Sequence, residues 1–192
     1  MIRIGITGGM GSGKSVVCEL FRLHGVPVFD ADKEAKLLND TSPRIKEELT
    51  RHFGSDLYKK GKLDRQKLAT LIFHDKQNLA LVNSIIHPVL ADQFIKWSKE
   101  RDSYPFVVID AAVLFEAGFE QHVDKVITIY APEAERIERV TRRDGIRKSQ
   151  VMARMQHQIP EEEKAKRADH VIYNDGQHSL IEQVANILQI LT

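Results

Sequence analysis

The chain has 192 residues, of which 42% are hydrophobic and 29% charged, and its formal net charge is +1. This composition is typical of a globular protein with one sizeable α/β core and inserted helical lobes, and the length is short for two independent domains. The small net charge argues against general binding to nucleic acid or to a membrane surface, so any anion site must be local. Cys18 is the only cysteine, which excludes an intramolecular disulfide and a cysteine-rich metal site.

The first residues read directly as a strand, without the charged-then-apolar pattern of a secretion signal. No apolar run reaches the length of a membrane span. We therefore expect a cytoplasmic protein, a monomer or small homo-oligomer, with neither nucleic acid nor membrane as a partner.

Hydrophobic periodicity and turn residues predict the elements in chain order. We expect five strands near positions 2, 26, 106, 126 and 171, and helices near 16–23 and 179–191. The region from 33 to 101 reads as helical throughout, with segments near 33–39, 43–53, 64–73, 76–85 and 88–101 and no strand. Residues 133–167 are polar and arginine-rich and have little to bury, which predicts an exposed mobile flap. The expected fold is α/β, a five-stranded parallel sheet flanked by helices, with a helical lobe (33–101) and a lid (133–167) inserted in a single domain.

One stretch carries a complete chemical motif, Gly-x-x-x-x-Gly-Lys-Ser from Gly8 to Ser15, between the first strand and the first helix. Glycines let consecutive backbone N–H groups surround a polyphosphate, and the positive end of the following helix points at the same anion. Lys14 would reach the β and γ phosphates, and the Ser15 hydroxyl would bind Mg²⁺. The alternative is a glycine-rich turn with a chance Lys-Ser. The candidate ATP-binding residues here are Gly8, Gly9, Met10, Gly11, Ser12, Gly13, Lys14, Ser15 and Val16.

Acidic residues end two of the predicted strands. Asp30 and Asp32 stand two apart, so in an extended segment they would point the same way. One could accept a hydroxyl proton while the other helps to hold Mg²⁺ through water, although Asp32 could instead cap the next helix. Asp110 resembles the acid that ends the second motif strand of phosphate-loop proteins, and its alternative is a structural acid.

Other candidates also have structural alternatives. Arg139 and Arg143 share a helix face, a like-charge arrangement that a polyphosphate would compensate, but nearby glutamates could make an ordinary ion-paired surface. His87-Pro88 could simply begin a helix. The segment Asn174-Asp175-Gly176 follows the last strand and could either wall an adenine pocket or form a plain turn.

A phosphate loop alone is shared by motors, switches and kinases. The sequence lacks the Asn-Lys-x-Asp segment of GTPases, and a small chain with a helical lobe and an arginine-rich flap favours a metabolite kinase. The alternatives are a nucleoside monophosphate kinase, whose acceptor has less need of a carboxylate base, and a non-catalytic ATP-sensing module, which would not explain the paired acids.

These motifs together resemble the dephospho-coenzyme A kinase family along the whole chain. The resemblance lies in the order and spacing of several short motifs. These motifs are the phosphate loop with the preceding Thr7, Asp30-Ala31-Asp32, His87-Pro88, Leu114-Phe115-Glu116, Arg143-Asp144-Gly145, Arg154 with Gln158, Lys164, and Asn174-Asp175-Gly176. The resemblance implies transfer of phosphate from ATP to the 3′-hydroxyl of the dephospho-coenzyme A ribose, with Mg²⁺.

The resemblance also implies roles for single residues. Asp32 would be the catalytic base, Lys14 the phosphate clamp, and Arg139 and Arg143 lid contacts to the transferring phosphate, while Asn174 to Gly176 would form part of the adenine pocket. The residues implied toward the acceptor are Asp30, Asp32, His87, Leu114, Phe115, Glu116 and Arg154. Two departures from the family pattern stand out: Ala112-Val113 replace a Pro-Leu pair before Leu114, and Arg136 stands where Gln is common.

Overall fold

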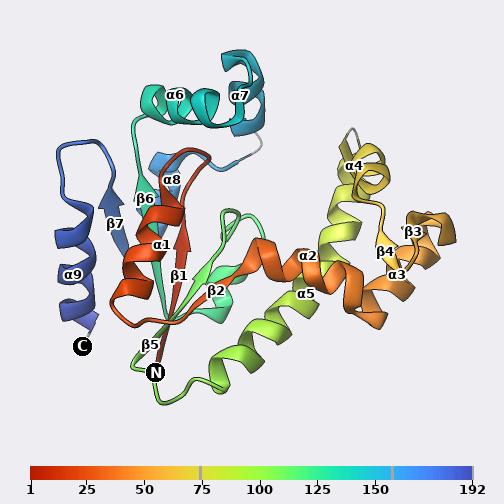
Figure 1. Ribbon diagram of the computed structural model, residues 1–192, viewed down its shortest axis with the longest axis horizontal. Coiled ribbons are helices and arrows are strands. Elements are labelled where there is room, and N and C mark those ends of the chain that lie inside the picture. The colour runs from red at the N-terminus through yellow and green to blue at the C-terminus, as the bar shows by residue number, and fades with distance from the viewer. Residues whose placement is uncertain (74, 157, 192) are drawn as a thin grey trace. The chain divides into compact units, whose positions relative to one another are not determined.

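The computed structural model describes residues 1–73, 75–156 and 158–191 (Figure 1). The chain divides into two compact units, one made of Met1–Phe29 with Ser98–Thr192 and the other of Asp30–Trp97. Each unit contains a cluster of buried apolar side chains of its own. Among the described residues, no helix is both long and apolar enough to cross a membrane.

A five-stranded sheet in the order β2-β5-β1-β6-β7 forms the centre of the first unit. Neighbouring strands run parallel in the pairs β1–β5, β1–β6 and β6–β7. The predicted parallel sheet is therefore confirmed. Its strands are β1 (Ile2–Thr7), β2 (Val28–Asp30), β5 (Phe106–Asp110), β6 (Lys125–Tyr130) and β7 (His170–Tyr173).

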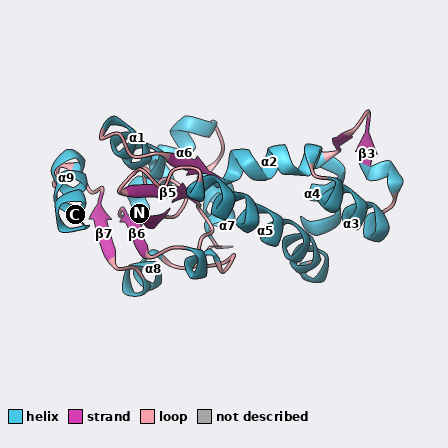
Figure 2. Ribbon diagram, turned by 90° about the horizontal axis from the view of Figure 1, so that it is seen from below, coloured by secondary structure: helices cyan, strands magenta, loops and turns pink. Residues whose placement is uncertain are grey.

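Helices cover both faces of this sheet. On one face, α1 (Lys14–Leu23) buries Val17 and Phe21, which lie one helical turn apart, and packs beside α9 (Leu180–Leu191). On the other face, α8 (Glu161–Arg167) packs against β6, and Figure 2 shows α8 and α1 on opposite sides of the sheet. A short 3₁₀ helix, η2 (Phe119–His122), lies between β5 and β6.

The segment after β6 is folded more tightly than the sequence predicts. It forms α6 (Glu133–Asp144), α7 (Lys148–Met155) and α8, and Ile137, Val140 and Val151 make a small core between α6 and α7. Arg136, Glu161 and Lys164 are buried as well. The expectation that residues 133–167 have little to bury is wrong, because charged side chains are buried here together with apolar ones.

The second unit contains α2 (Ala31–Thr41), α3 (Pro43–Phe53), the 3₁₀ helix η1 (Ser55–Leu57), α4 (Arg65–Phe73) and α5 (Lys76–Lys99). Its core joins Ile45 and Leu49 of α3 to Leu68 of α4 and Val82 of α5. The helices predicted near 33–39, 43–53 and 64–73 are confirmed, with α2 beginning two residues earlier than expected.

The two helices predicted on either side of His87-Pro88 form a single helix, α5, with Pro88 inside it. A proline in a helix interior costs one backbone hydrogen bond and a steric clash. Here Val82, Ile86, Leu90 and Phe94, each four residues after the last, are all buried. This unbroken apolar stripe stabilises the helix through the proline, which itself is exposed.

A short antiparallel hairpin pairs β3 (Tyr58–Lys59) with β4 (Lys62–Leu63), so the expectation of no strand between 33 and 101 is also wrong. Lys60 and Gly61 form its turn with φ of 50° and 80°. Two positive φ values in a two-residue loop are the requirement of the tightest hairpin turns. Strands of two residues are too short to show an alternating pattern, which explains why the sequence does not reveal them.

Candidate active site

The phosphate-loop motif connects the end of β1 to the start of α1, which begins at Lys14. Gly11 and Gly13 have φ of 83° and 92°, and a Cβ atom at Gly11 would lie 2.5 Å from the backbone oxygen of Arg136. A Cβ atom at Gly13 would overlap the side-chain amide of Asn174. Gly13 is also the N-cap of α1 and carries no capping side chain, so the first N–H groups of the helix are left for an anion.

Lys14 pairs with Asp110, the last residue of β5, the strand next to β1 in the sheet. The ammonium group and the carboxylate retain 14% and 11% side-chain exposure, so both lie at the floor of the site and not in bulk water. Burial, reinforced by the neighbouring Asp110, raises the pKa of the Cys18 thiol, so this cysteine stays protonated. Asp110 thus holds the lysine that the sequence assigns to the phosphates.

Asn174 and Arg139 fasten the loop to the end of β7. The Asn174 side-chain amide donates to the Ser12 carbonyl at 2.8 Å. Arg139 donates to the Asn174 carbonyl at 3.1 Å and to the Gly11 carbonyl at 3.5 Å, and pairs with Glu135 at 2.6 Å. Asn174 of the candidate adenine pocket, the phosphate loop and Arg139 therefore lie together. Their spacing in the sequence alone does not indicate this.

The rest of the segment Asn174-Asp175-Gly176 forms a turn. The backbone N–H groups of Gln177 and His178 donate to the Asp175 carboxylate, and the first of these bonds is the largest cause of its lowered pKa. Gly176 has φ of 77°, the left-handed conformation that glycine adopts without strain. The segment thus forms the turn that the sequence analysis gave as one alternative, and Asn174 contacts the phosphate loop at the same time.

The loop also contacts the chain that follows α7. The Met10 N–H donates to the side-chain oxygen of Gln158 at 2.9 Å, and the Met10 side chain packs on the small core of α6 and α7. Gln158 therefore touches the phosphate loop directly. The sequence singled it out only through the family pattern, without a role.

Two other candidate arginines, Arg143 predicted at the phosphate and Arg154 predicted at the acceptor, lie at the surface. Arg143, 66% exposed, pairs with the adjacent Asp144 at 2.7 Å, and this hydrogen bond raises the pKa of the guanidinium. Arg154 is exposed on α7. Both side chains therefore extend into solvent instead of packing on the phosphate loop as Arg139 does.

The segment Leu114-Phe115-Glu116 lies inside the first unit. Leu114 is fully buried and Phe115 is 7% exposed with the Arg167 guanidinium 4.2 Å from its ring centre. The Glu116 carboxylate accepts a hydrogen bond from the Ile159 N–H at 3.0 Å and lies 3.3 Å from Lys164 Nζ. These contacts give all three residues packing and pairing partners within the protein.

The paired acids at the end of β2 do not lie in an extended segment. The strand ends at Asp30, whose carboxylate accepts a hydrogen bond from the Lys33 N–H at 2.9 Å and so caps α2. Asp32 sits in the first helical turn and is exposed. The extended geometry expected for the pair is wrong, and the cap is Asp30 instead of Asp32. A free-standing carboxylate in a first turn is stabilised by the helix dipole.

His87 lies on α5 of the second unit, half-buried, in the turn that contains Pro88. Burial lowers the pKa of its imidazole, which favours the neutral form near pH 7.

Three comparisons place the chain among known proteins. Residues 2–179 match a family model described as dephospho-CoA kinase. A dephospho-CoA kinase of Porphyromonas gingivalis is 45% identical over 98% of this chain and 94% of its own length. A crystal structure of the Thermus thermophilus protein TT1252 has 38% identity and a TM-score of 0.85, covering 100% and 98% of the two chains. The dephospho-CoA kinase structure from Campylobacter jejuni has 25% identity and a TM-score of 0.70, covering 97% and 95%.

Proposed function

We propose, from the premise that this chain belongs to the dephospho-CoA kinase family, that it transfers the γ-phosphoryl group of ATP to the 3′-hydroxyl of dephospho-CoA. The chain is a phosphotransferase, and coenzyme A and ADP are the products, as in the last step of coenzyme A synthesis. The observation that carries the proposal is the complete phosphate loop, with Lys14 and an uncapped helix start, on a sheet of the matching fold. Neither a nucleoside monophosphate kinase nor a sensing module is favoured by the family match.

Bound nucleotide phosphate would compete with Asp110 for the Lys14 ammonium group. The backbone N–H groups at the start of α1 would surround the same phosphates, and the glycine conformations at positions 11 and 13 keep this surface free of side chains. Val16 follows in the exposed first turn of α1. Electrostatic stabilisation by groups already in place is the main contribution that a protein makes to phosphoryl transfer.

The donors beside Lys14 suit a magnesium ion. Mg²⁺ prefers oxygen ligands and retains several waters, and the site offers the exposed Ser15 hydroxyl and the Asp110 carboxylate. Ser15 would bind the ion directly, and Asp110, once released from Lys14, would hold it through water. When bound, Mg²⁺ neutralises charge on the β and γ phosphates.

Asp32 is our candidate for the base that receives the proton of the acceptor hydroxyl. Two features support it: the carboxylate is exposed, and the capping task next to it is taken by Asp30. Arg139, together with Arg143 after a lid movement, would meet the charge that develops on the transferring phosphoryl group. Asp30, His87, Leu114 to Glu116 and Arg154 remain candidates for acceptor contacts, and a cytoplasmic location remains a prediction.

Release of ADP by the purified protein tests the function. ATP and Mg²⁺ are supplied with dephospho-CoA, with AMP, CMP or UMP, or with no acceptor, and the product is examined by ³¹P NMR for a new 3′-phosphomonoester. We expect turnover only with dephospho-CoA, at about 1–100 s⁻¹. Turnover with a nucleoside monophosphate would show that this nucleotide, and not dephospho-CoA, is the acceptor. ATP binding without turnover on any acceptor would favour the sensing module.

A further inference from the structure

Four charged side chains lie behind the phosphate loop, and three of them, Arg136, Glu161 and Lys164, have no role in the reaction proposed above. Lys164 of α8 is fully buried, and its Nζ lies 3.3 Å from Glu116 Oε1 and 3.7 Å from Glu161 Oε1. Glu161 is 3% exposed and Arg136 is 8% exposed. We call Arg136, Glu161, Lys164 and Glu116 the charge chain, because cations and carboxylates alternate along it.

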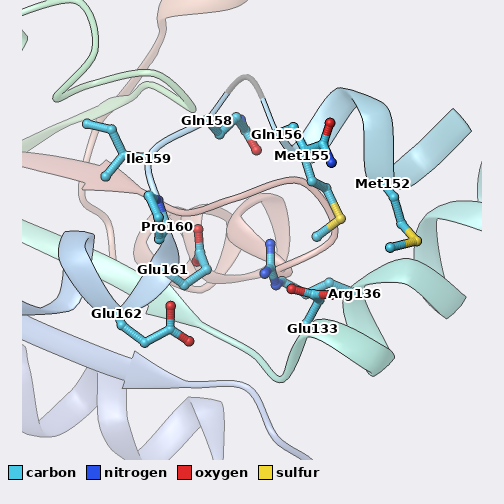
Figure 3. A pocket seen from close by; sticks show the side chains of 10 residues that line it. All are labelled: Glu133, Arg136, Met152, Met155, Gln156, Gln158, Ile159, Pro160, Glu161 and Glu162. Carbon is cyan, nitrogen blue, oxygen red and sulfur yellow. The ribbon is translucent and has the colours of Figure 1, made fainter. Parts of the chain in front are cut away.

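The charge chain reaches the phosphate loop at Gly9. A Cβ atom at Gly9 would overlap the Glu161 carboxylate and would lie 2.8 Å from a guanidinium nitrogen of Arg136. Figure 3 shows the Arg136 and Glu161 side chains in one pocket of about 410 Å³ between α6, α7 and the start of α8. A buried negative charge is therefore in contact with the backbone of a loop whose ligand is itself strongly negative.

Glu161 is also poorly neutralised by hydrogen bonds. Among the described residues, neither of its carboxylate oxygens makes a hydrogen bond, and the same holds for Lys164 Nζ. Lys164 Nζ and Glu161 Oε1 therefore interact as opposite charges 3.7 Å apart, without a hydrogen bond. In a buried site such an interaction is little weakened by salt and acts over a longer range than it would at the surface.

We propose that Lys164 is a positioning residue for nucleotide binding, which acts through Glu161: it neutralises the carboxylate behind Gly9 so that the loop can accept a polyphosphate. Glu116 holds Lys164 in place and, through the Ile159 N–H, fixes the chain that leads into α8. The proposal rests on the proposed function only for the identity of the nucleotide as ATP.

The proposal requires opposite effects from removing the two charges, whereas a purely structural cluster would lose affinity with either substitution. Calorimetric titration with Mg²⁺-ATP, without acceptor, measures this. We expect Lys164→Met to weaken ATP binding about tenfold and Glu161→Gln to strengthen it several-fold, with the double variant within about threefold of the parent chain. Lys164→Arg should retain affinity. Lys166→Met, an exposed neighbour on α8, is the matched control.

Two further measurements keep the test decisive. Adenosine carries no phosphate, so its affinity should be the same in all variants. If Lys164→Met does not fold, the double variant is compared with Glu161→Gln, from which it differs only by the Lys164 charge, and should bind ATP about tenfold more weakly. Weaker ATP binding by Glu161→Gln, or unchanged binding on loss of the Lys164 charge, would overturn the proposal. Because no turnover is measured, its failure is distinct from failure of the kinase assignment.

Discussion

Replacing Asn174 by aspartate should loosen the phosphate loop without removing any group that we propose to touch phosphate. The substitution keeps the shape of the side chain but removes the N–H donor that reaches the Ser12 carbonyl at 2.8 Å. It also places a negative charge beside the loop. Asn174→Ala removes the donor without adding the charge, so the pair separates the two effects.

The expected magnitude follows from the burial of the acceptor. Ser12 is 1% exposed, so while Asn174 covers its carbonyl the acceptor is shielded from solvent. A buried acceptor left without a partner costs about 1–3 kcal/mol. For a chain of this size each kcal/mol lowers the melting temperature by about 2–4 °C, so Asn174→Ala should lower it by about 2–12 °C. Asn174→Asp should bind ATP more weakly than Asn174→Ala because of the added charge.

Thermal unfolding with and without ATP, followed by calorimetry, measures both effects. Gln177→Ala, at an exposed position in the same turn, is the control and should leave the melting temperature and the ATP-dependent increase unchanged. If Asn174→Ala unfolds within 1 °C of the parent chain, the hydrogen bond to Ser12 does not stabilise the loop. If Asn174→Asp and Asn174→Ala bind ATP equally well, the added negative charge does not repel the phosphates of bound ATP.

Two further predictions concern the proposed chemistry, and a third concerns how the stability of the fold depends on pH. Asp32→Asn should lower kcat by about 10²–10⁴-fold with little change in ATP affinity, and near-normal turnover would remove Asp32 from the role of base. Arg143→Ala should reduce kcat more than it raises the acceptor KM, with exposed Arg142→Ala as control, whereas a pure KM effect would mean that Arg143 only binds substrate. The lowered pKa of His87 means that the unfolded chain binds its proton more tightly, so stability is lost as pH falls below about 6.5; urea unfolding at pH 7.5 and 5.5 should show a smaller loss in His87→Gln than in the parent chain.

The sheet and the phosphate loop were predictable because each has a local signal. The strand β1 before the loop alternates apolar and other residues, β5 runs apolar, and the motif fixes eight consecutive positions at the junction of strand and helix. The geometry at Asp32 was not predictable in the same way. Whether a chain leaves a strand as extended backbone or as a helix is decided by capping, and the choice of Asp30 as cap depends on one hydrogen bond to Lys33.

The helical lobe shows that tertiary packing can outweigh a local rule. Pro88 reads as a boundary because its ring opposes the preceding turn. The stripe of Val82, Ile86, Leu90 and Phe94 spans that boundary and buries four side chains, each worth about 1.5–3 kcal/mol. A proline in the helix interior costs about 3 kcal/mol, which is less than the stripe contributes. In the sequence, the same stripe is visible as apolar residues spaced four positions apart on both sides of Pro88, and this spacing favours one helix.

The charge chain behind Gly9 was hidden for a different reason. Charged residues are mostly exposed in folded proteins, so a segment with many arginines, lysines and glutamates is predicted to lie at the surface. Burial of charge is favourable only when opposite charges meet, and the partners here come from α6, α8 and the chain after β5. Glu161 and Lys164 lie three residues apart on one helix face, which is a visible pairing signal, but their contact with Gly9 and Glu116 depends on chain separations of more than 40 residues. Glycine at position 9 therefore serves two purposes: it lets the loop surround a phosphate, and it leaves room for a carboxylate whose charge Lys164 must balance.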